Sequence, residues 1–267
     1  MAALRAGSTL TLFLLLTFIL IPVQALANAL HLPLRKSLPH RYHQLVAKIF
    51  GIKITVLGEV VRDEGVLLVV SHSSWLDIVI FSAVMPVSFV AKSEVAGWAF
   101  FGLLAKLQNT VFVARERRSA TGEARDKIRE RLLAGDALIL FPEGTSNDGN
   151  RVKPFKSALM GAAESELADG HHVRVQPVST AYIGLYGLPM GRENRPFFAW
   201  YGDMDLVPHL WEALKTGPMD VVVEFHAPLS LDSMDRKQLA SAAEAIVRKG
   251  QARALAGIPP KPAHSHA

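Results

Sequence analysis

The spacing of hydrophobic residues predicts a chain in which short buried strands alternate with helices. Residues 66–70 form a continuous apolar run typical of a buried strand, and residues 75–84 follow it with the pattern of a helix. Residues 138–141 form a similar apolar run. Further strands are expected at residues 87–91, 109–115, 173–178, 197–201 and 221–225, and further helices at residues 155–167, 206–215 and 232–249. This alternation predicts an α/β fold: a single domain with a mostly parallel central sheet flanked by helices.

Three other features refine this prediction. Ala124, Ile128 and Leu132 repeat at a spacing of four residues and so mark the buried stripe of a helix. Pro177 lies within an expected strand and indicates a sheet edge or a bulge. Residues 95–107 are apolar on all sides, which fits either a core helix or an interfacial helix that walls an acyl chain.

The N-terminal segment predicts an association with a membrane. Residues 7–34 contain no Asp, Glu, Lys or Arg, and residues 10–21 are almost entirely apolar. A spanning helix needs about 20 apolar residues, so the segment fits a spanning or re-entrant helix. A cleaved secretory signal is the alternative, because Arg5 precedes the apolar run and residues 25–27 (Ala-Leu-Ala) form an acceptable cleavage pattern. We expect an uncleaved N-terminal membrane-associated helix.

These patterns divide the chain into three segments. Residues 1–50 are expected to form a membrane-anchoring helical segment, residues 51–255 the α/β domain, and residues 256–267 a disordered tail. A chain of 267 residues is long enough for one domain of this kind with a full core.

Composition and charge narrow the possible partners. Half of the residues are hydrophobic and the net charge is +5. The basic residues between positions 35 and 48 fit an anionic cytoplasmic leaflet, although a solvated helix face explains them equally well. No basic run with interleaved aromatic residues appears, so a nucleic-acid partner is not expected. The chain has no cysteine, which excludes disulfides and thiolate catalysis, and His171 and His172 lack the neighbours that a metal site needs.

His72 and Asp77 have the spacing of a general-base pair. His72 follows the strand at residues 66–70, and Asp77 falls in the first turn of the next helix. A carboxylate on one imidazole nitrogen fixes the tautomer and leaves the other nitrogen to take a proton from a hydroxyl. The alternative is a capped helix, with Ser73 or Ser74 as N-cap and Asp77 as an acid favoured by the helix dipole.

Two other expected strands also end in charged residues. Arg115 closes the strand at residues 109–115, and Glu143 with Gly144 follows the run at residues 138–141. In open α/β sheets, sites form in the crevice outside the carboxyl ends of the strands. We therefore expect these side chains to converge with His72 and Asp77.

Four ordered blocks in the chain resemble those of a known family. They are His72-Ser-Ser-Trp-Leu-Asp77, Val111-Phe-Val-Ala-Arg115, Phe141-Pro-Glu-Gly-Thr145 and Val175-Gln-Pro-Val178. Together they resemble the glycerolipid acyltransferases of the 1-acylglycerol-3-phosphate acyltransferase group. Each block is weak alone, but four in this order are specific.

The resemblance implies an O-acyltransferase that moves a fatty acyl group from acyl carrier protein or coenzyme A to the free hydroxyl of a lyso-lipid, without a metal or cofactor. It places the enzyme at the bacterial inner membrane, with the active site facing the cytoplasm. His72 would be the base and Asp77 its orienting partner. The implied acceptor-site residues are Arg115, Glu143, Gly144 and Thr145.

One departure from the family pattern concerns the acceptor. Phosphate-handling members usually carry Arg after the Pro-Glu-Gly-Thr block, whereas this chain has Ser146, followed by Asn147-Asp-Gly-Asn-Arg151. That form resembles bacterial lyso-ornithine-lipid acyltransferases. Two other functions remain open, a thioesterase or lipid hydrolase and a non-catalytic membrane-anchored lipid-binding protein. The Gly-x-Ser-x-Gly motif of many hydrolases is absent.

Overall fold

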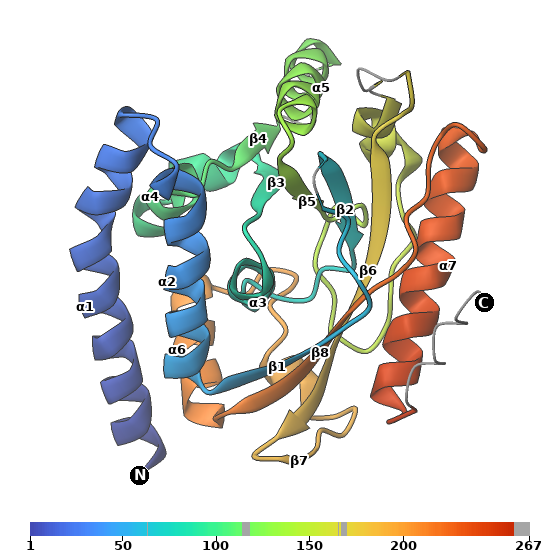
Figure 1. The fold of residues 1–267 in the computed structure, drawn as a ribbon. Coiled ribbons are helices and arrows are strands. Elements are labelled where there is room, and N and C mark those ends of the chain that lie inside the picture. The colour runs from blue at the N-terminus through green and yellow to red at the C-terminus, as the bar shows by residue number, and fades with distance from the viewer. Residues whose placement is uncertain (63, 114–117, 165, 167–169, 259–267) are drawn as a thin grey trace.

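The computed structural model describes residues 1–62, 64–113, 118–164, 166 and 170–258, and its strands form one mixed sheet (Figure 1). The strand order is β1-β8-β6-β2-β5-β3-β4, and the short β7 pairs with β6. Adjacent strands run parallel except at the β6–β8 and β6–β7 pairs. The strands are β1 Ile52–Leu57, β2 Val66–Val70, β3 Ser88–Lys92, β4 Val111–Val113, β5 Ala137–Leu140, β6 Arg174–Leu185, β7 Leu188–Pro189 and β8 Met219–Phe225. The predicted α/β fold with a mostly parallel sheet is confirmed.

Helices cover both faces of this sheet (Figure 1). The α-helices are α1 Ala2–Ala29, α2 Leu34–Phe50, α3 Leu76–Val84, α4 Ala99–Leu107, α5 Arg118–Leu133, α6 Leu206–Thr216 and α7 Arg236–Leu255. Short 3₁₀ helices are η1 Ser93–Gly97, η2 Ser157–Glu164 and η3 Arg195–Phe197. Buried side chains of α1, α2, α3 and α6 form one core cluster, whereas those of α5, η2 and α7 form the other.

The central position of β2 in the sheet explains why its sequence is apolar throughout. All five of its residues are buried. Val66, Leu68 and Val70 join the core cluster on one face, and Leu67 and Val69 join the cluster on the other. Successive side chains of a strand point to opposite faces, so a strand covered on both sides has no polar position. The strand carries the chain to the site at its carboxyl end.

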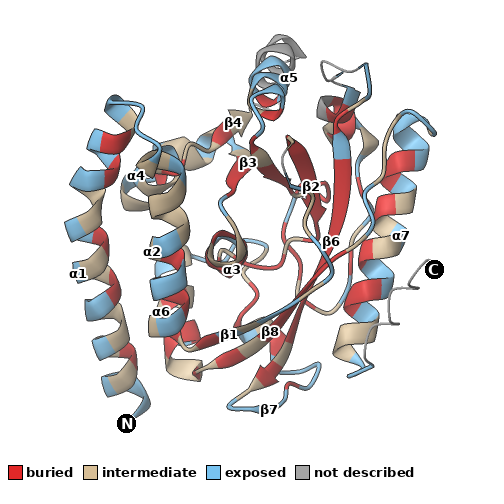
Figure 2. Cartoon of the chain, in the orientation of Figure 1, coloured by how far each residue is buried: buried red, intermediate tan, exposed pale blue. Residues whose placement is uncertain are grey.

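Helix α1 is a packed part of the fold with one exposed apolar face (Figure 2). Its 28 residues are long and apolar enough to cross a membrane, and 22% of its most hydrophobic window is buried. Its buried residues are Ala6, Phe13, Thr17, Gln24 and Ala27. The exposed face carries Leu4, Leu12, Leu15, Phe18, Ile19 and Leu26. The apolar run at residues 10–21 is therefore the middle of a longer helix.

Two predicted elements differ from the structure. Residues 157–164 form the 3₁₀ helix η2 in place of an expected α-helix. The expected strand at residues 197–201 is wrong, because this segment leaves η3 as an irregular loop. Phe198 in that loop is fully buried, and the Trp200 N–H donates to the carbonyl of Ser73 at 2.8 Å. Phe198 and Ala199 are thus buried without belonging to a strand, whereas Phe197 is exposed.

Pro177 does not lie at a sheet edge, but the strand pairing is irregular there, as the predicted bulge implies: Val175 bridges Leu229, whereas Val178 pairs with Phe225, a register change of one residue. Its strand, β6, pairs with β2 on one side and β8 on the other. The His226 N–H donates to the Pro177 carbonyl at 3.0 Å. Proline has no N–H to return to the carbonyl of His226, and the Gln176 side-chain amide donates to that carbonyl at 2.9 Å. A neighbouring side chain therefore lets a central strand accept proline.

Candidate active site

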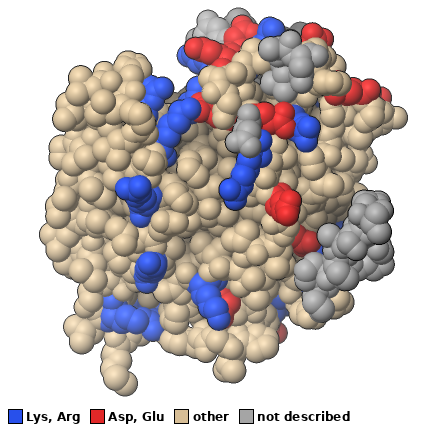
Figure 3. Space-filling model, viewed as in Figure 1, with Lys and Arg blue, Asp and Glu red and all other residues tan. Residues whose placement is uncertain are grey.

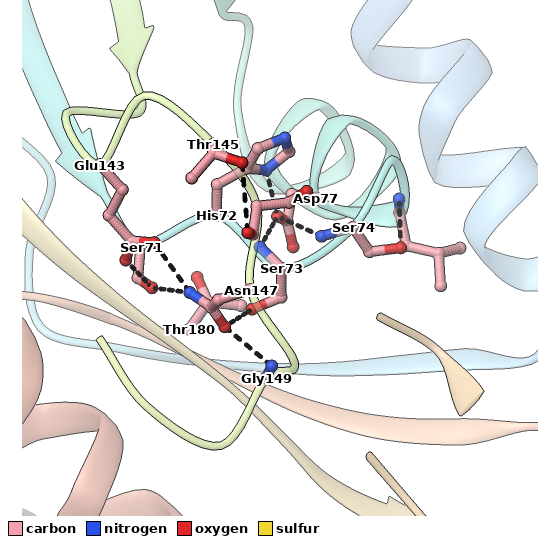
Figure 4. Close-up of polar contacts among 12 residues, drawn as sticks. Ser71, His72, Ser73, Ser74, Asp77, Glu143, Thr145, Asn147, Gly149 and Thr180 are labelled. Carbon is pink, nitrogen blue, oxygen red and sulfur yellow. Dashed lines mark hydrogen bonds and ion pairs between the residues drawn. The ribbon is translucent and has the colours of Figure 1, made fainter. Parts of the chain in front are cut away.

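His72 and Asp77 form the pair that their spacing predicts (Figure 4). Nδ1 of His72 lies 2.8 Å from Oδ2 of Asp77. The short turn between β2 and α3 folds the carboxylate back onto the ring. The His72 side chain is 21% exposed, so the second ring nitrogen, Nε2, remains the position for a substrate hydroxyl.

Asp77 has no exposed surface, and four donors hold its carboxylate. Oδ2 also accepts the N–H groups of Ser73 at 2.9 Å and Ser74 at 3.0 Å. Oδ1 accepts the hydroxyl of Tyr182 at 2.8 Å. A buried carboxylate needs such donors to keep its charge. Asp77 thus binds both the turn before α3 and the His72 ring. It is the predicted acid in the first turn of α3, but the N-cap is Trp75 and neither Ser73 nor Ser74.

The imidazole of His72 stacks on Phe141, which follows β5. The ring centroids are 4.0 Å apart and the planes differ by 23°. Phe141 in turn stacks on Phe89 of β3, at 6.3 Å. These contacts link His72 and Phe141, which follow β2 and β5, to Phe89 near the start of β3, and they cover one face of the His72 ring.

Glu143 lies in a buried network next to His72. Its carboxylate accepts the Ser71 hydroxyl at 2.5 Å and the Asn147 side-chain amide at 2.8 Å (Figure 4). The Asn147 N–H donates to the carbonyl of His72 at 2.9 Å. Burial raises the pKa of the Glu143 carboxyl, while bonds from Ser71, Asn147 and the Lys153 main chain oppose that shift. Glu143 therefore ties the loop after β5 to the turn that carries His72.

The remaining predicted residues lie along the same loop. Gly144 has φ +75°, a left-handed conformation that favours glycine. Thr145 is exposed and lies beside His72 (Figure 4). The carbonyl of Ser146 accepts Nζ of Lys153 at 2.9 Å. Arg115 lies outside the described residues. His72, Asp77, Glu143, Gly144 and Thr145 are therefore brought together.

Sequence reasoning missed several residues that support the site. Tyr182 and Asn147 bind the two carboxylates, yet neither follows a recognisable spacing from its partner. Arg195 is also buried: its guanidinium donates to the Tyr182 carbonyl at 3.3 Å and to the Asn150 side chain at 2.7 Å. The Asn-rich turn at residues 147–150 was the only local sequence feature that pointed to these supporting residues.

An apolar cavity of about 190 Å³ opens beside the site. Helices α1, α2, α3 and α4 and strand β3 contribute to its wall, with Phe13, Val46, Trp75, Phe89, Phe101 and Leu104 among the lining residues. Phe89 connects this wall to His72 through Phe141. Within the described part of the chain, no group of three or more His, Asp or Glu side chains could hold a metal ion.

The raised pKa of Glu143 gives a prediction for stability against pH. A carboxyl whose pKa is higher in the folded state contributes stability below its unfolded pKa, and that contribution is lost as pH rises through the folded value. Glu143→Gln keeps the size of the side chain and removes the ionisation. As pH rises above about 4, where the unfolded carboxyl ionises, the melting temperature of the unmodified protein should therefore fall relative to that of Glu143→Gln.

Glu193 is exposed, so Glu193→Gln is the matched control in the same thermal scans. Its melting temperature should show no such divergence from that of the unmodified protein. A constant difference between the protein and Glu143→Gln, or a divergence of opposite sign, would contradict the assignment.

Comparisons with known proteins identify the family. The family model for acyltransferases matches residues 52–181. A lyso-ornithine lipid O-acyltransferase of Brucella abortus is 46% identical over 245 residues, which cover 91% of this chain and 92% of that protein. One of Rhizobium meliloti is 41% identical over 266 residues, covering 96% and 91%. A 1-acyl-sn-glycerol-3-phosphate acyltransferase of Neisseria gonorrhoeae is 31% identical over 188 residues, covering 70% and 69%.

A solved structure shares the fold. The crystal structure of the 1-acyl-sn-glycerophosphate acyltransferase PlsC from Thermotoga maritima matches with a TM-score of 0.68 and 22% identity, covering 98% of this chain and all of that one. The extent of the match to the Brucella abortus and Rhizobium meliloti proteins shows the family. The chain therefore belongs to the acyltransferase family that includes lyso-ornithine lipid and 1-acyl-sn-glycerol-3-phosphate acyltransferases, and it is an acyltransferase.

Proposed function

We propose that this enzyme transfers a fatty acyl group from a thioester, on acyl carrier protein or coenzyme A, to the free hydroxyl of lyso-ornithine lipid. The observation that carries the proposal is the partly exposed His72–Asp77 pair, together with an apolar cavity whose wall includes Trp75, three residues after His72, and Phe89, which stacks on Phe141. Two relatives with lyso-ornithine lipid in their names cover nearly the whole chain, which supports this acceptor over lysophosphatidic acid.

In the proposed reaction, Nε2 of His72 takes the proton from the acceptor hydroxyl as its oxygen attacks the thioester carbon. The tetrahedral intermediate then expels the thiolate by breaking the carbon–sulfur bond. The thiolate receives the proton from the His72 imidazolium, so an ester and a free thiol leave the site. Asp77 stabilises the imidazolium between the two proton transfers.

The apolar cavity suits one fatty acyl chain of the reacting lipids. Its wall is formed almost entirely by apolar side chains, and burying each CH₂ group contributes about 0.8 kcal/mol. Phe89 of this wall stacks on Phe141, which in turn stacks on the imidazole of His72. Residues 99–107 of α4 contribute to the wall, which favours the acyl-chain interpretation of the apolar segment at residues 95–107.

The acceptor headgroup would lie over the loop after β5. Thr145 is its exposed residue beside His72, and Gly144 permits the turn that presents it. Glu143 is enclosed by protein donors, so we assign it the role of holding the loop and not of touching the acceptor. Arg115 would contact an anionic group of the acceptor, as the family resemblance implies.

Among the described residues, a second histidine lies between a serine and a carboxylate, as in many hydrolases. This arrangement does not support a hydrolase. Oγ of Ser179 lies 2.6 Å from Nε2 of His226, whose Nδ1 is 3.9 Å from Glu224. However, Ser179 is 2% exposed, and its hydroxyl donates to the carbonyl of Val247 in α7. This serine is covered by α7 and serves to dock that helix.

We also propose that α1 lies along the surface of the inner membrane, on its cytoplasmic side, and is not cleaved. Its first turn is bonded to α6 through Arg5 and the Lys215 carbonyl (2.8 Å). At the other end, Gln24 and Asn28 donate to the Leu107 carbonyl of α4. A spanning α1 would carry the whole domain into the bilayer, whereas an in-plane helix buries only its apolar face. Figure 3 shows that most of the surface over α1 carries no charged groups. Basic side chains lie on the adjoining surface.

The absence of native cysteine makes the orientation of α1 directly testable. Single cysteines at Ala3 and Leu30, which are both exposed, mark the two ends of the helix. In sealed membrane vesicles of known orientation, an impermeant maleimide should label both positions from the cytoplasmic side and neither from the other. A cysteine at Leu15 should stay protected until detergent is added. Labelling of the two ends from opposite sides would establish a spanning helix instead.

The proposed activity is tested with the detergent-solubilised enzyme, one acyl-carrier thioester, and lyso-ornithine lipid or lysophosphatidic acid as acceptor. We expect ester product from lyso-ornithine lipid. His72→Ala should lower its formation by about 10²–10⁴-fold, because a general base contributes a factor of that order. His171→Ala, whose side chain is 71% exposed in a loop, is the matched control.

Other outcomes of this assay are equally informative. Product from lysophosphatidic acid alone would overturn the acceptor. Free fatty acid formed without any acceptor would indicate a hydrolase, and lipid binding without product would indicate a binding protein. Near-normal transfer by folded His72→Ala would falsify the base assignment.

A further inference from the structure

The catalytic pair has a third member that no local sequence pattern marks. Tyr182 comes 105 residues after Asp77, and its hydroxyl donates to Oδ1 of that carboxylate at 2.8 Å. We propose that Tyr182 is a positioning residue for the acyl transfer, acting through Asp77 on His72 without touching either substrate. This inference rests on the proposed function.

The sheet aims Tyr182 at the site. β6 pairs with β8, and the register of the two strands shifts between Tyr182 and Gly184. Such irregularities re-aim side chains and are common next to active sites. The Tyr182 residue is 3% exposed, and its carbonyl accepts the buried Arg195, which also holds Asn150. The ring is therefore fixed from the sheet and from the loop after β5.

The two oxygens of Asp77 have different donors. Oδ2 accepts His72, Ser73 and Ser74, whereas the Tyr182 hydroxyl is the one donor to Oδ1 among the described hydrogen bonds. Burial and the neighbouring Asp77 carboxylate raise the pKa of Tyr182 well above its usual value. The phenol thus keeps its proton at neutral pH and acts as a constant donor. It locks the carboxylate in the rotation that presents Oδ2 to His72.

This bond influences the protonation of His72. While the imidazole is neutral, the buried charge of Asp77 depends on its hydrogen-bond donors, whereas an imidazolium would neutralise it directly. Removing one donor therefore favours the imidazolium and leaves less free base. Among the described residues, Tyr182 on β6 interacts with Asp77, and Glu143 on the loop after β5 interacts with His72. Tyr182 therefore helps to keep His72 available as a base.

Tyr182→Phe tests this role, because it removes only the hydroxyl. We expect kcat at neutral pH to fall by about tenfold, as for the loss of a hydrogen bond to a charged group, with KM for donor and acceptor unchanged. The acid limb of the pH–rate profile should move up by about half to one pH unit. Tyr186→Phe is the matched control: Tyr186 is 55% exposed in the turn after β6, and its change should move neither quantity.

A second variant keeps the test valid should Tyr182→Phe fold poorly. 3-Fluorotyrosine placed at position 182 retains the ring and the hydroxyl but donates a stronger hydrogen bond. Its acid limb should shift to lower pH, opposite to that of Tyr182→Phe. A loss of activity that is equal at all pH values, or a rise in KM without a pH shift, would show a merely structural role and overturn the inference.

The same assay separates this inference from the proposed function. Suppose that the unmodified enzyme forms ester and that Tyr182→Phe and the fluorinated protein both match its kcat and acid limb. This result would overturn the role of Tyr182 and leave the proposed function intact. Failure of the unmodified enzyme to form ester from lyso-ornithine lipid or lysophosphatidic acid would overturn the proposed function and the inference with it.

Discussion

The site depends on keeping one carboxylate buried and charged. Asp77 has no exposed surface, yet donors from the turn after β2 and from β6 occupy both of its oxygens. An unpaired buried charge would cost several kcal/mol, so these donors must be in place before the carboxylate can orient an imidazole. The turn places two main-chain N–H groups around Asp77, and the sheet delivers Tyr182. The position of β6 next to β2 is therefore a requirement of the proposed chemistry as well as of the fold.

A second buried carboxylate supports the same turn from another side. Glu143 binds Ser71 directly and reaches the His72 carbonyl through Asn147. The two carboxylates thus flank His72: one fixes its ring and the other fixes its main chain. This division explains how the turn after β2 holds the imidazole in one orientation, with Phe141 closing one face of the ring. Only the open edge of the imidazole then remains for the proposed acceptor hydroxyl.

Local patterns in the sequence predict the parts of the structure that local physics decides. The apolar run of β2, the helix after it and the His72–Asp77 spacing are all short-range features, and the structure contains each of them. The segment at residues 197–201 looks like a strand because it is apolar, but its burial comes from packing against the turn after β2.

Long-range partners are invisible to the same reasoning. Tyr182 and Asp77 are 105 residues apart, and Gln176 completes the pairing of a proline strand with a residue 50 positions away. Nothing in the local spacing of these residues marks them. They become recognisable only once the strand order places β6 between β2 and β8.

The central claim is that His72, held by Asp77, activates the acceptor for direct attack on the thioester. The most direct test of this claim is a rapid-quench experiment that measures the release of free thiol. The enzyme is in excess over the acyl donor, and no acceptor is present. The account predicts neither thiol release nor acylated protein until lyso-ornithine lipid is added, and then thiol and ester appear at the same rate. A burst of thiol with acyl-enzyme before the acceptor is added would contradict it.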